Sequence, residues 1–162
     1  NKKKKFKILN ETKVIYEKKQ NFSRIQLIEF SILYIMLNFN QIVSKEIEEL
    51  GDIEFTSKVN EKLKNLIITS SANGTNFKKL LIDINIQYEN LIKEINENSN
   101  IQFITKDKSE EEILAILEDL KFDFKEQYNL KKIESLEKKL INNLDENSYS
   151  ELIKLKNQLN RE

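Results

Sequence analysis

The sequence contains no cysteine, histidine, proline or tryptophan, and only two of its 162 residues are glycine. Without cysteine and histidine, the chain lacks disulfides, thiolate nucleophiles, imidazole bases and the commonest zinc ligands. With no proline, and with glycine only at Gly51 and Gly74, few positions can interrupt a helix. The composition therefore predicts an all-α protein in which any chemistry would depend on carboxylates, lysines and tyrosines.

A net charge is also lacking, because 27 basic residues balance 27 acidic residues. A chain with no net charge has no general attraction for nucleic acid, so we expect no direct nucleic-acid site. No apolar run approaches the length of a membrane span and no signal peptide is recognisable, so we expect a cytoplasmic protein without membrane contact. The first residue is asparagine rather than methionine, which favours a piece of a longer chain.

Residues 1–22 form a basic start, with eight lysines against two glutamates. A segment of this kind can contact phosphates, but this one has no arginine and no evenly spaced aromatic side chains for stacking on bases. We therefore favour a solvated linker end, which Val14, Ile15 and Tyr16 anchor on the rest of the protein. A phosphate-contacting arm is the alternative interpretation.

The stretch Ile25–Leu37 is the most hydrophobic part of the chain, interrupted only by single glutamine, glutamate and serine residues. A helix that is apolar on most of its circumference must be surrounded by other helices. Ser23 can cap its start, and the apolar pattern ends at about Asn38. We expect a central helix over 24–39, within a helical bundle that extends over 23–105.

Amphipathic patterns predict the other helices of the bundle. A short helix over 45–50 is expected between a cap at Ser44 and a stop at Gly51. A longer helix is expected to begin at Thr56 or Ser57. Two further helices follow a polar turn, with apolar faces made of Phe77, Leu80, Leu81 and Ile84, and then of Tyr88, Leu91, Ile92 and Ile95.

A much longer helix is expected over 109–143. Ser109 and Glu112 match a capping box, in which each side chain accepts a hydrogen bond from the backbone N–H of the other. Apolar residues recur at helical spacing, and no breaker occurs until about Asn142. Such a helix is roughly 50 Å long, whereas a bundle of about 85 residues is only roughly 30 Å across. The helix must therefore break or project from the bundle.

The last helix carries Leu152, Leu155 and Leu159 at spacings of three and four. This narrow stripe suits a single partner helix. The stretch Leu130–Leu144 is the expected partner, which gives an antiparallel helical hairpin. A second capping box, Ser148–Glu151, is expected at the start of the last helix.

The long helix and the hairpin together form a second part of the chain, over 106–162. A two-helix hairpin buries only one face of each helix, so it is marginally stable alone. Ile153 lies off the leucine stripe and is expected to be exposed. We hypothesise that the hairpin is a docking element whose spare apolar face is covered by another protein. The expected contact residues are Tyr149, Ile153, Lys156 and Asn160.

No catalytic constellation is recognisable in the sequence. Asp119 and Asp123 lie four residues apart and share a helical face, as magnesium ligands can. They are flanked by Lys121 and Lys125, a pattern typical of a solvated helix surface. Two isolated glycines cannot form a phosphate-binding loop. We therefore expect neither a metal site nor an enzyme within these residues.

The pattern Glu29-x-x-Ile-Leu-x-Ile-Met-Leu-Asn-x-x-x-Ile-Val43 resembles the opening of the C-terminal, helicase-binding domain of bacterial DNA primase. That family has arginine where Phe30 stands here, and His-Pro where Phe39 and Asn40 stand. The expected order of elements also resembles the family, which has a helical bundle, a long connecting helix and a terminal hairpin ending in a leucine-rich helix. The resemblance covers roughly 24–162.

The resemblance implies a non-catalytic domain that docks on the N-terminal domain of the replicative DNA helicase and modulates priming and unwinding at the replication fork. It implies that the nucleotidyltransferase chemistry lies upstream, together with the magnesium-binding acidic residues and the zinc module, so no cofactor is expected here. It also implies a monomer or a swapped dimer. The N-terminal assembly domain of the helicase itself and an unrelated helical adaptor are the alternatives.

Overall fold

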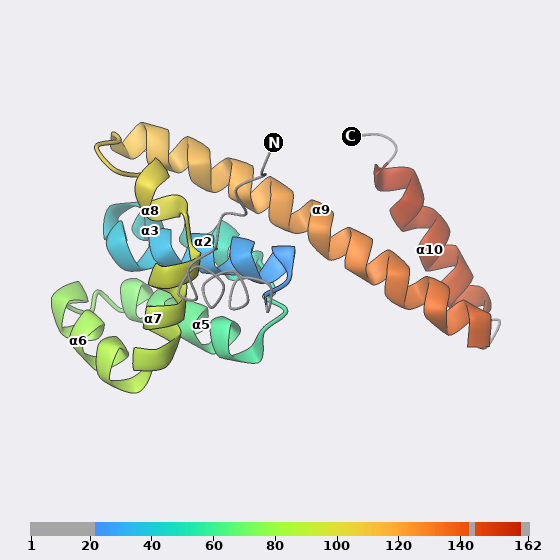
Figure 1. Cartoon of the computed structure of the whole chain (residues 1–162), viewed down its shortest axis with the longest axis horizontal. Coiled ribbons are helices and arrows are strands. Elements are labelled where there is room, and N and C mark those ends of the chain that lie inside the picture. Colours follow the sequence, from blue (N-terminus) through green and yellow to red (C-terminus); the bar gives the residue numbers. More distant parts are fainter. Residues whose placement is uncertain (1–21, 143–144, 160–162) are drawn as a thin grey trace, which may run out of the picture.

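The computed structural model describes residues 22–142 and 145–159, and all regular elements within these ranges are α-helices. Figure 1 shows α2 to α8 gathered into a bundle, α9 lying across the bundle and extending beyond it, and α10 packed on the far part of α9. The all-α prediction is confirmed. The helices are α2 (Arg24–Asn38), α3 (Asn40–Lys45), α4 (Ile47–Asp52), α5 (Lys58–Ala72), α6 (Phe77–Gln87), α7 (Glu89–Asn98), α8 (Ile101–Ile104), α9 (Glu110–Asn142) and α10 (Glu146–Leu159).

Helix α2 is the centre of the bundle and contacts α5, α7 and α9. At its start the hydroxyl of Ser23 accepts a hydrogen bond from the backbone N–H of Gln26, and the Gln26 side chain accepts one from the backbone N–H of Ser23. The predicted central helix is thus confirmed to within one residue. Its completely buried hydrophobic side chains are Ile32, Leu33, Ile35 and Met36.

The chain after α2 differs from the prediction of a helix that Ser44 caps and Gly51 stops. Ser44 lies inside α3, where its hydroxyl donates a hydrogen bond to the backbone carbonyl of Asn40, so it caps nothing. Helix α4 instead begins after Glu46, and Gly51 lies within it. The predicted cap failed because a serine can bond the preceding helical turn as readily as it caps a new one.

The connector 53–57 between α4 and α5 is held by Glu29, a completely buried carboxylate on α2. Its Oε1 accepts hydrogen bonds from the backbone N–H of Thr56 at 2.5 Å and from the Thr56 hydroxyl at 2.7 Å. Its Oε2 accepts from the side-chain amide of Asn60 at 2.6 Å. A buried carboxylate is tolerated only when it is satisfied in this way. Glu29 therefore fixes the start of α5 against α2.

Lys64 is a second buried charge beside the same connector, with 1% of its side chain exposed. Its ammonium donates a hydrogen bond to the backbone carbonyl of Ile53, lies 3.0 Å from Glu61, and sits 5.3 Å from the ring centre of Phe55. Glu61 also accepts from the backbone N–H of Phe55 at 2.8 Å. The connector is therefore bound to α5 as well as to α2.

Helix α9 is unbroken over 33 residues, so it is roughly 50 Å long and projects from the bundle. Ile113, Leu117 and Phe124 on its first half belong to the core of the bundle. The predicted capping box is confirmed, because Glu112 accepts from the backbone N–H of Ser109 at 2.8 Å and the Ser109 hydroxyl accepts from that of Glu112 at 3.3 Å. The predicted division of the chain at residues 105–106 stays a prediction.

Removing the Glu29 carboxylate should destabilise the bundle. Glu29→Ala leaves the backbone N–H of Thr56 and the amide of Asn60 without their buried acceptor. We expect the free energy of unfolding to fall by about 3 kcal/mol. Urea denaturation followed by circular dichroism measures this change. Glu48→Ala, which removes an exposed glutamate, should alter it by less than about 0.5 kcal/mol. Equal effects of the two substitutions would contradict a structural role for Glu29.

Glu61 should make the stability of the bundle dependent on acidity. Burial raises the pKa of its carboxyl, but hydrogen bonds from the backbone of Phe55 and from Lys64 outweigh burial and hold the pKa below 4.5, its usual value. A depressed folded-state pKa contributes stability above the unfolded-state pKa, and this contribution is lost as the pH falls through the folded-state pKa. Glu61→Gln should therefore flatten the loss of stability below about pH 4.5, measured by urea denaturation across that range.

Candidate functional site

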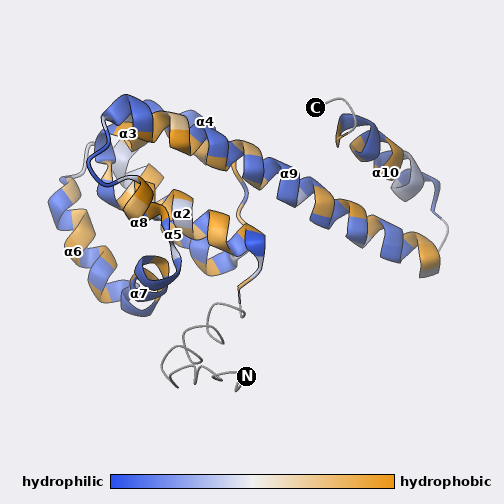
Figure 2. Cartoon of the chain, turned by 45° about the horizontal axis from the view of Figure 1, so that its top comes forward, coloured by the Kyte–Doolittle hydropathy of each residue, from blue (hydrophilic) through white to orange (hydrophobic). Residues whose placement is uncertain are grey.

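The second half of α9 and helix α10, which runs back along it, form the terminal hairpin (Figure 1). The hairpin has a small apolar core of its own, separate from the core of the bundle. Figure 2 shows hydrophobic residues continuing along α9 and onto α10, beyond the bundle. The side chains of the hairpin core are Ile133, Leu136, Leu140, Leu152, Leu155 and Leu159.

Helix α10 begins at Glu146, earlier than the predicted capping box allows. The Asp145 carboxylate accepts hydrogen bonds from the backbone N–H of Ser148 at 2.9 Å and from its hydroxyl at 2.6 Å, and these bonds lower the pKa of Asp145. Glu151 faces α9 and pairs with Lys132. The capping box of Ser148 and Glu151 is therefore wrong, because an aspartate three residues before Ser148 holds the start of the helix.

Two ion pairs across the hairpin mark its two sides. Nζ of Lys156 lies 2.6 Å from Oε1 of Glu137, and Nζ of Lys132 lies 2.6 Å from Oε1 of Glu151. Successive residues of a helix are rotated by about 100°. Glu137 follows a core residue of α9 and Lys132 precedes one, so the two pairs lie on opposite sides of the leucine core. The Glu137–Lys156 pair defines the first side.

Exposed apolar side chains gather on this first side. Leu130 and Ile141 lie seven residues before and four residues after the glutamate of the first pair, so they share its face of α9. Tyr149 and Ile153 lie seven and three residues before the lysine of that pair, so they share its face of α10. We call these four residues the apolar flank. Their exposed fractions are 40% for Leu130, 83% for Ile141, 56% for Tyr149 and 41% for Ile153.

Two of the four predicted contact residues, Tyr149 and Ile153, belong to the apolar flank. Lys156 lies beside them but is engaged with Glu137 in the ion pair across the hairpin. Asn160 lies outside the described residues. The structure thus brings three of these side chains onto one side of the hairpin, and their role in binding a partner stays a prediction.

Sequence reasoning missed the part of the flank that α9 contributes. Leu130 was predicted only as the first residue of the partner stretch Leu130–Leu144, and no contact was predicted for Ile141. Their spacing around Glu137 is visible in the sequence. However, only the pairing of Glu137 with Lys156 shows that this face of α9 and the exposed face of α10 form one surface.

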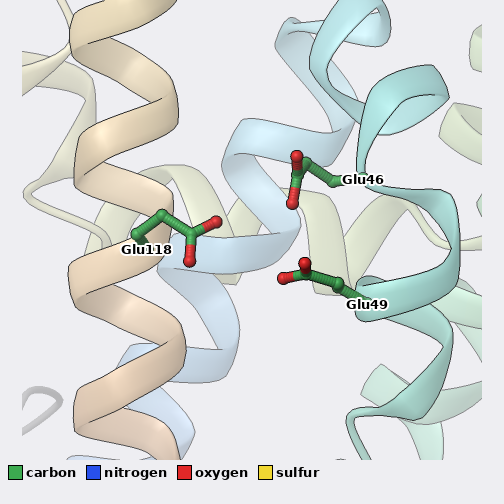
Figure 3. A group of neighbouring side chains, drawn as sticks. All are labelled: Glu46, Glu49 and Glu118. Carbon is green, nitrogen blue, oxygen red and sulfur yellow. The ribbon is translucent and has the colours of Figure 1, made fainter.

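A cluster of three carboxylates, Glu46, Glu49 and Glu118, lies where α9 crosses the start of α4 (Figure 3). One oxygen of each lies within 4.8 Å of the others, a spacing that could suit a divalent cation. The ammonium of Lys121 occupies this position. It lies 3.0 Å from Glu46 and 2.5 Å from Glu118, and it also donates a hydrogen bond to Glu49.

The pKa of Lys121 reflects this environment. Burial lowers the pKa of its ammonium, but hydrogen bonds to Glu118, Glu49 and Glu46 outweigh burial and raise the pKa above its usual value. Lys121 is therefore charged at neutral pH and offsets the repulsion among the three carboxylates. We interpret this cluster as an ionic link that holds α9 on the bundle.

No family model, no curated protein and no solved structure matches this chain. Among the described residues, no helix combines the length and the apolar character that crossing a membrane requires.

Replacing the Lys121 side chain should separate a structural link from a metal site. Lys121→Met leaves three neighbouring carboxylates without their cation, and we expect the free energy of unfolding to fall by about 2 kcal/mol. Millimolar magnesium should leave the melting temperature of the unsubstituted protein unchanged, because the ammonium already fills the cluster. Thermal unfolding followed by circular dichroism measures both effects. A magnesium-dependent rise in the unsubstituted protein would show that a metal ion can displace the lysine.

Proposed function

We propose that this chain is the helicase-binding domain of a bacterial DNA primase. In this role it is a non-catalytic docking domain of a cytoplasmic replication protein, and its partner is the N-terminal domain of the replicative DNA helicase. The resemblance around Glu29 and the order of a bundle, a long helix and a terminal hairpin support this assignment. The apolar flank carries it, because it gives the hairpin a surface that a partner can cover.

The apolar flank has the composition of a protein-binding surface. Tyr149 supplies the aromatic side chain that is enriched in interface cores, and three aliphatic side chains lie with it. Complete burial of an isoleucine or leucine side chain contributes roughly 1.5–3 kcal/mol. The Glu137–Lys156 pair crosses the same surface and can fix the register of a partner through polar contacts.

The position of the hairpin also suits docking. It is joined to the bundle through the continuous helix α9 and has its own core, so a partner can enclose the hairpin without contacting the bundle. Among the described residues, six apolar side chains form the hairpin core, and additional burial by a partner would add to the stability of so small a core. Docking on the hairpin would then hold the upstream priming chemistry at the replication fork.

Placing a charge in the apolar flank should strongly weaken partner binding. We expect Ile153→Asp to weaken the affinity for the purified replicative helicase at least about 30-fold, which corresponds to a hot-spot side chain worth about 2 kcal/mol. Because Ile153 is 41% exposed, its replacement should leave the helical content of the protein unchanged. Isothermal titration calorimetry measures the affinity, and circular dichroism measures the fold.

Ile86→Asp provides the matched control, since Ile86 is 76% exposed and lies on α6, far from the hairpin (Figure 1). This variant should bind the helicase with unchanged affinity. Equal affinity of the Ile153→Asp variant and the unsubstituted protein would exclude the apolar flank as the interface. A failure of the unsubstituted protein to bind the helicase would overturn the assignment. Assembly into hexamers or trimers would instead favour the assembly domain of the helicase.

A further inference from the structure

A groove of about 500 Å³ lies between α9 and the connector that joins α4 to α5. Its apolar lining comes from Ile53 on the connector and from Phe122, Phe124 and Tyr128 on α9. Phe124 is buried, but 54% of the surface of Phe122 is exposed. The groove can therefore receive a large apolar side chain, which would cover the exposed ring of Phe122.

The edge of the groove is predominantly acidic. Its carboxylates belong to Glu49, Asp52, Glu54 and Glu118, and its two lysines are Lys121 and Lys125. The charge of Lys121 is already matched by the carboxylates that surround it. Asp52 and Glu54 are exposed on the connector side. An occupant of this groove should therefore combine positive charge with a large apolar side chain.

One segment of this chain has that composition. Residues 1–21 contain eight lysines and two glutamates, a net charge of about +6. The other part of the chain, 22–162, holds 19 of the 27 basic residues and 25 of the 27 acidic residues, a net charge of about −6. Within the basic segment, Phe6 stands between Lys5 and Lys7, which places an aromatic ring between two positive charges.

The place where this segment joins the bundle favours the same groove. The described chain starts at Phe22, and the guanidinium of Arg24 lies 4.0 Å from the carboxylate of Asp123 on α9. Asp123 stands between the groove residues Phe122 and Phe124 in the sequence. The covalent connection at Phe22 keeps the segment near the bundle, at an effective concentration in the millimolar range for a short linker.

We propose that residues 1–21 dock within their own chain in the groove between α9 and the α4–α5 connector. The exposed carboxylates of Asp52 and Glu54 would attract the lysines of this segment, and the exposed ring of Phe122 offers an apolar contact to the ring of Phe6. Docking of this segment uses neither the apolar flank nor a second protein, so it is independent of helicase binding. Docking of this segment would be a contact within one chain, on the half of α9 that packs on the bundle, and added salt would weaken it.

The lack of tryptophan allows a direct test with the full chain. Phe122→Trp places a single tryptophan in the groove, at a side chain exposed enough to accept the larger ring. Docking would cover the tryptophan ring. When docking is removed the ring becomes exposed to water, so the maximum of tryptophan emission should shift to longer wavelength. We expect that shift after Lys5→Gln/Phe6→Ser/Lys7→Gln in the same chain.

Substitutions in the groove test the charge requirement. Asp52→Asn/Glu54→Gln and high salt should each produce the same shift, because both weaken the attraction between the segment and the groove. Asp83→Asn/Glu97→Gln removes the same number of charges from α6 and α7, and it should leave the emission unchanged. Tryptophan emission that does not respond to the changes at Lys5, Phe6 and Lys7 would overturn the proposal.

A second measurement uses the protein without the tryptophan. The backbone amide signals of Ile53 and Tyr128 in a nuclear magnetic resonance spectrum should move after Lys5→Gln/Phe6→Ser/Lys7→Gln, and should not move on dilution. Unchanged signals would overturn docking. Signals that depend on protein concentration would assign the contact to a second copy of the chain and would overturn docking within one chain.

Discussion

The buried carboxylate of Glu29 is the contact on which the arrangement of the bundle depends. Desolvating a carboxylate costs several kcal/mol, and the cost is recovered only when its donors are aligned. The donors here come from Thr56 and Asn60, far along the chain, so α2 and the start of α5 fit together in one relative position. That position presents Phe55 to α9, where its ring lies 5.6 Å from the ring of Phe124.

The same chain of contacts explains why the hairpin stands apart from the bundle. Phe124 and the ionic cluster around Lys121 hold the middle of α9 on the connector and on α4. Among the described residues, none of α9 beyond Tyr128 belongs to the core of the bundle, and the apolar residues there form a separate core with α10. The bundle therefore acts as the support of a long helix, and the hairpin at the end presents its apolar flank to its surroundings.

Two helix caps and the pairing of α10 with the end of α9 were predictable from the sequence, whereas the contacts of Glu29 were not. The caps at Ser23 and Ser109 were predicted because donor and acceptor lie three residues apart. The predicted cap at Ser44 was wrong because its hydroxyl can also donate a hydrogen bond to the preceding turn of the same helix. The partners of Glu29 have no sequence signature. The exposure of Ile153 followed from its place off the leucine stripe, but the contribution of Ile141 required the register of two helices, which only the folded hairpin supplies.

Although the total charge of the chain is balanced, the molecule has two different surfaces: the apolar flank of the hairpin and the groove with an acidic edge. The apolar flank would contribute to the affinity for a partner through burial of hydrophobic surface, and this contribution depends little on ionic strength. The groove between α9 and the connector is lined by aromatic rings and edged by carboxylates, so an attraction to the lysine-rich residues 1–21 must weaken as salt screens it. Because α9 carries one surface on each half, a single rigid helix can present an ionic contact near the bundle and an apolar contact at its far end. A rise in ionic strength should therefore weaken binding at the groove and leave binding at the apolar flank largely unchanged.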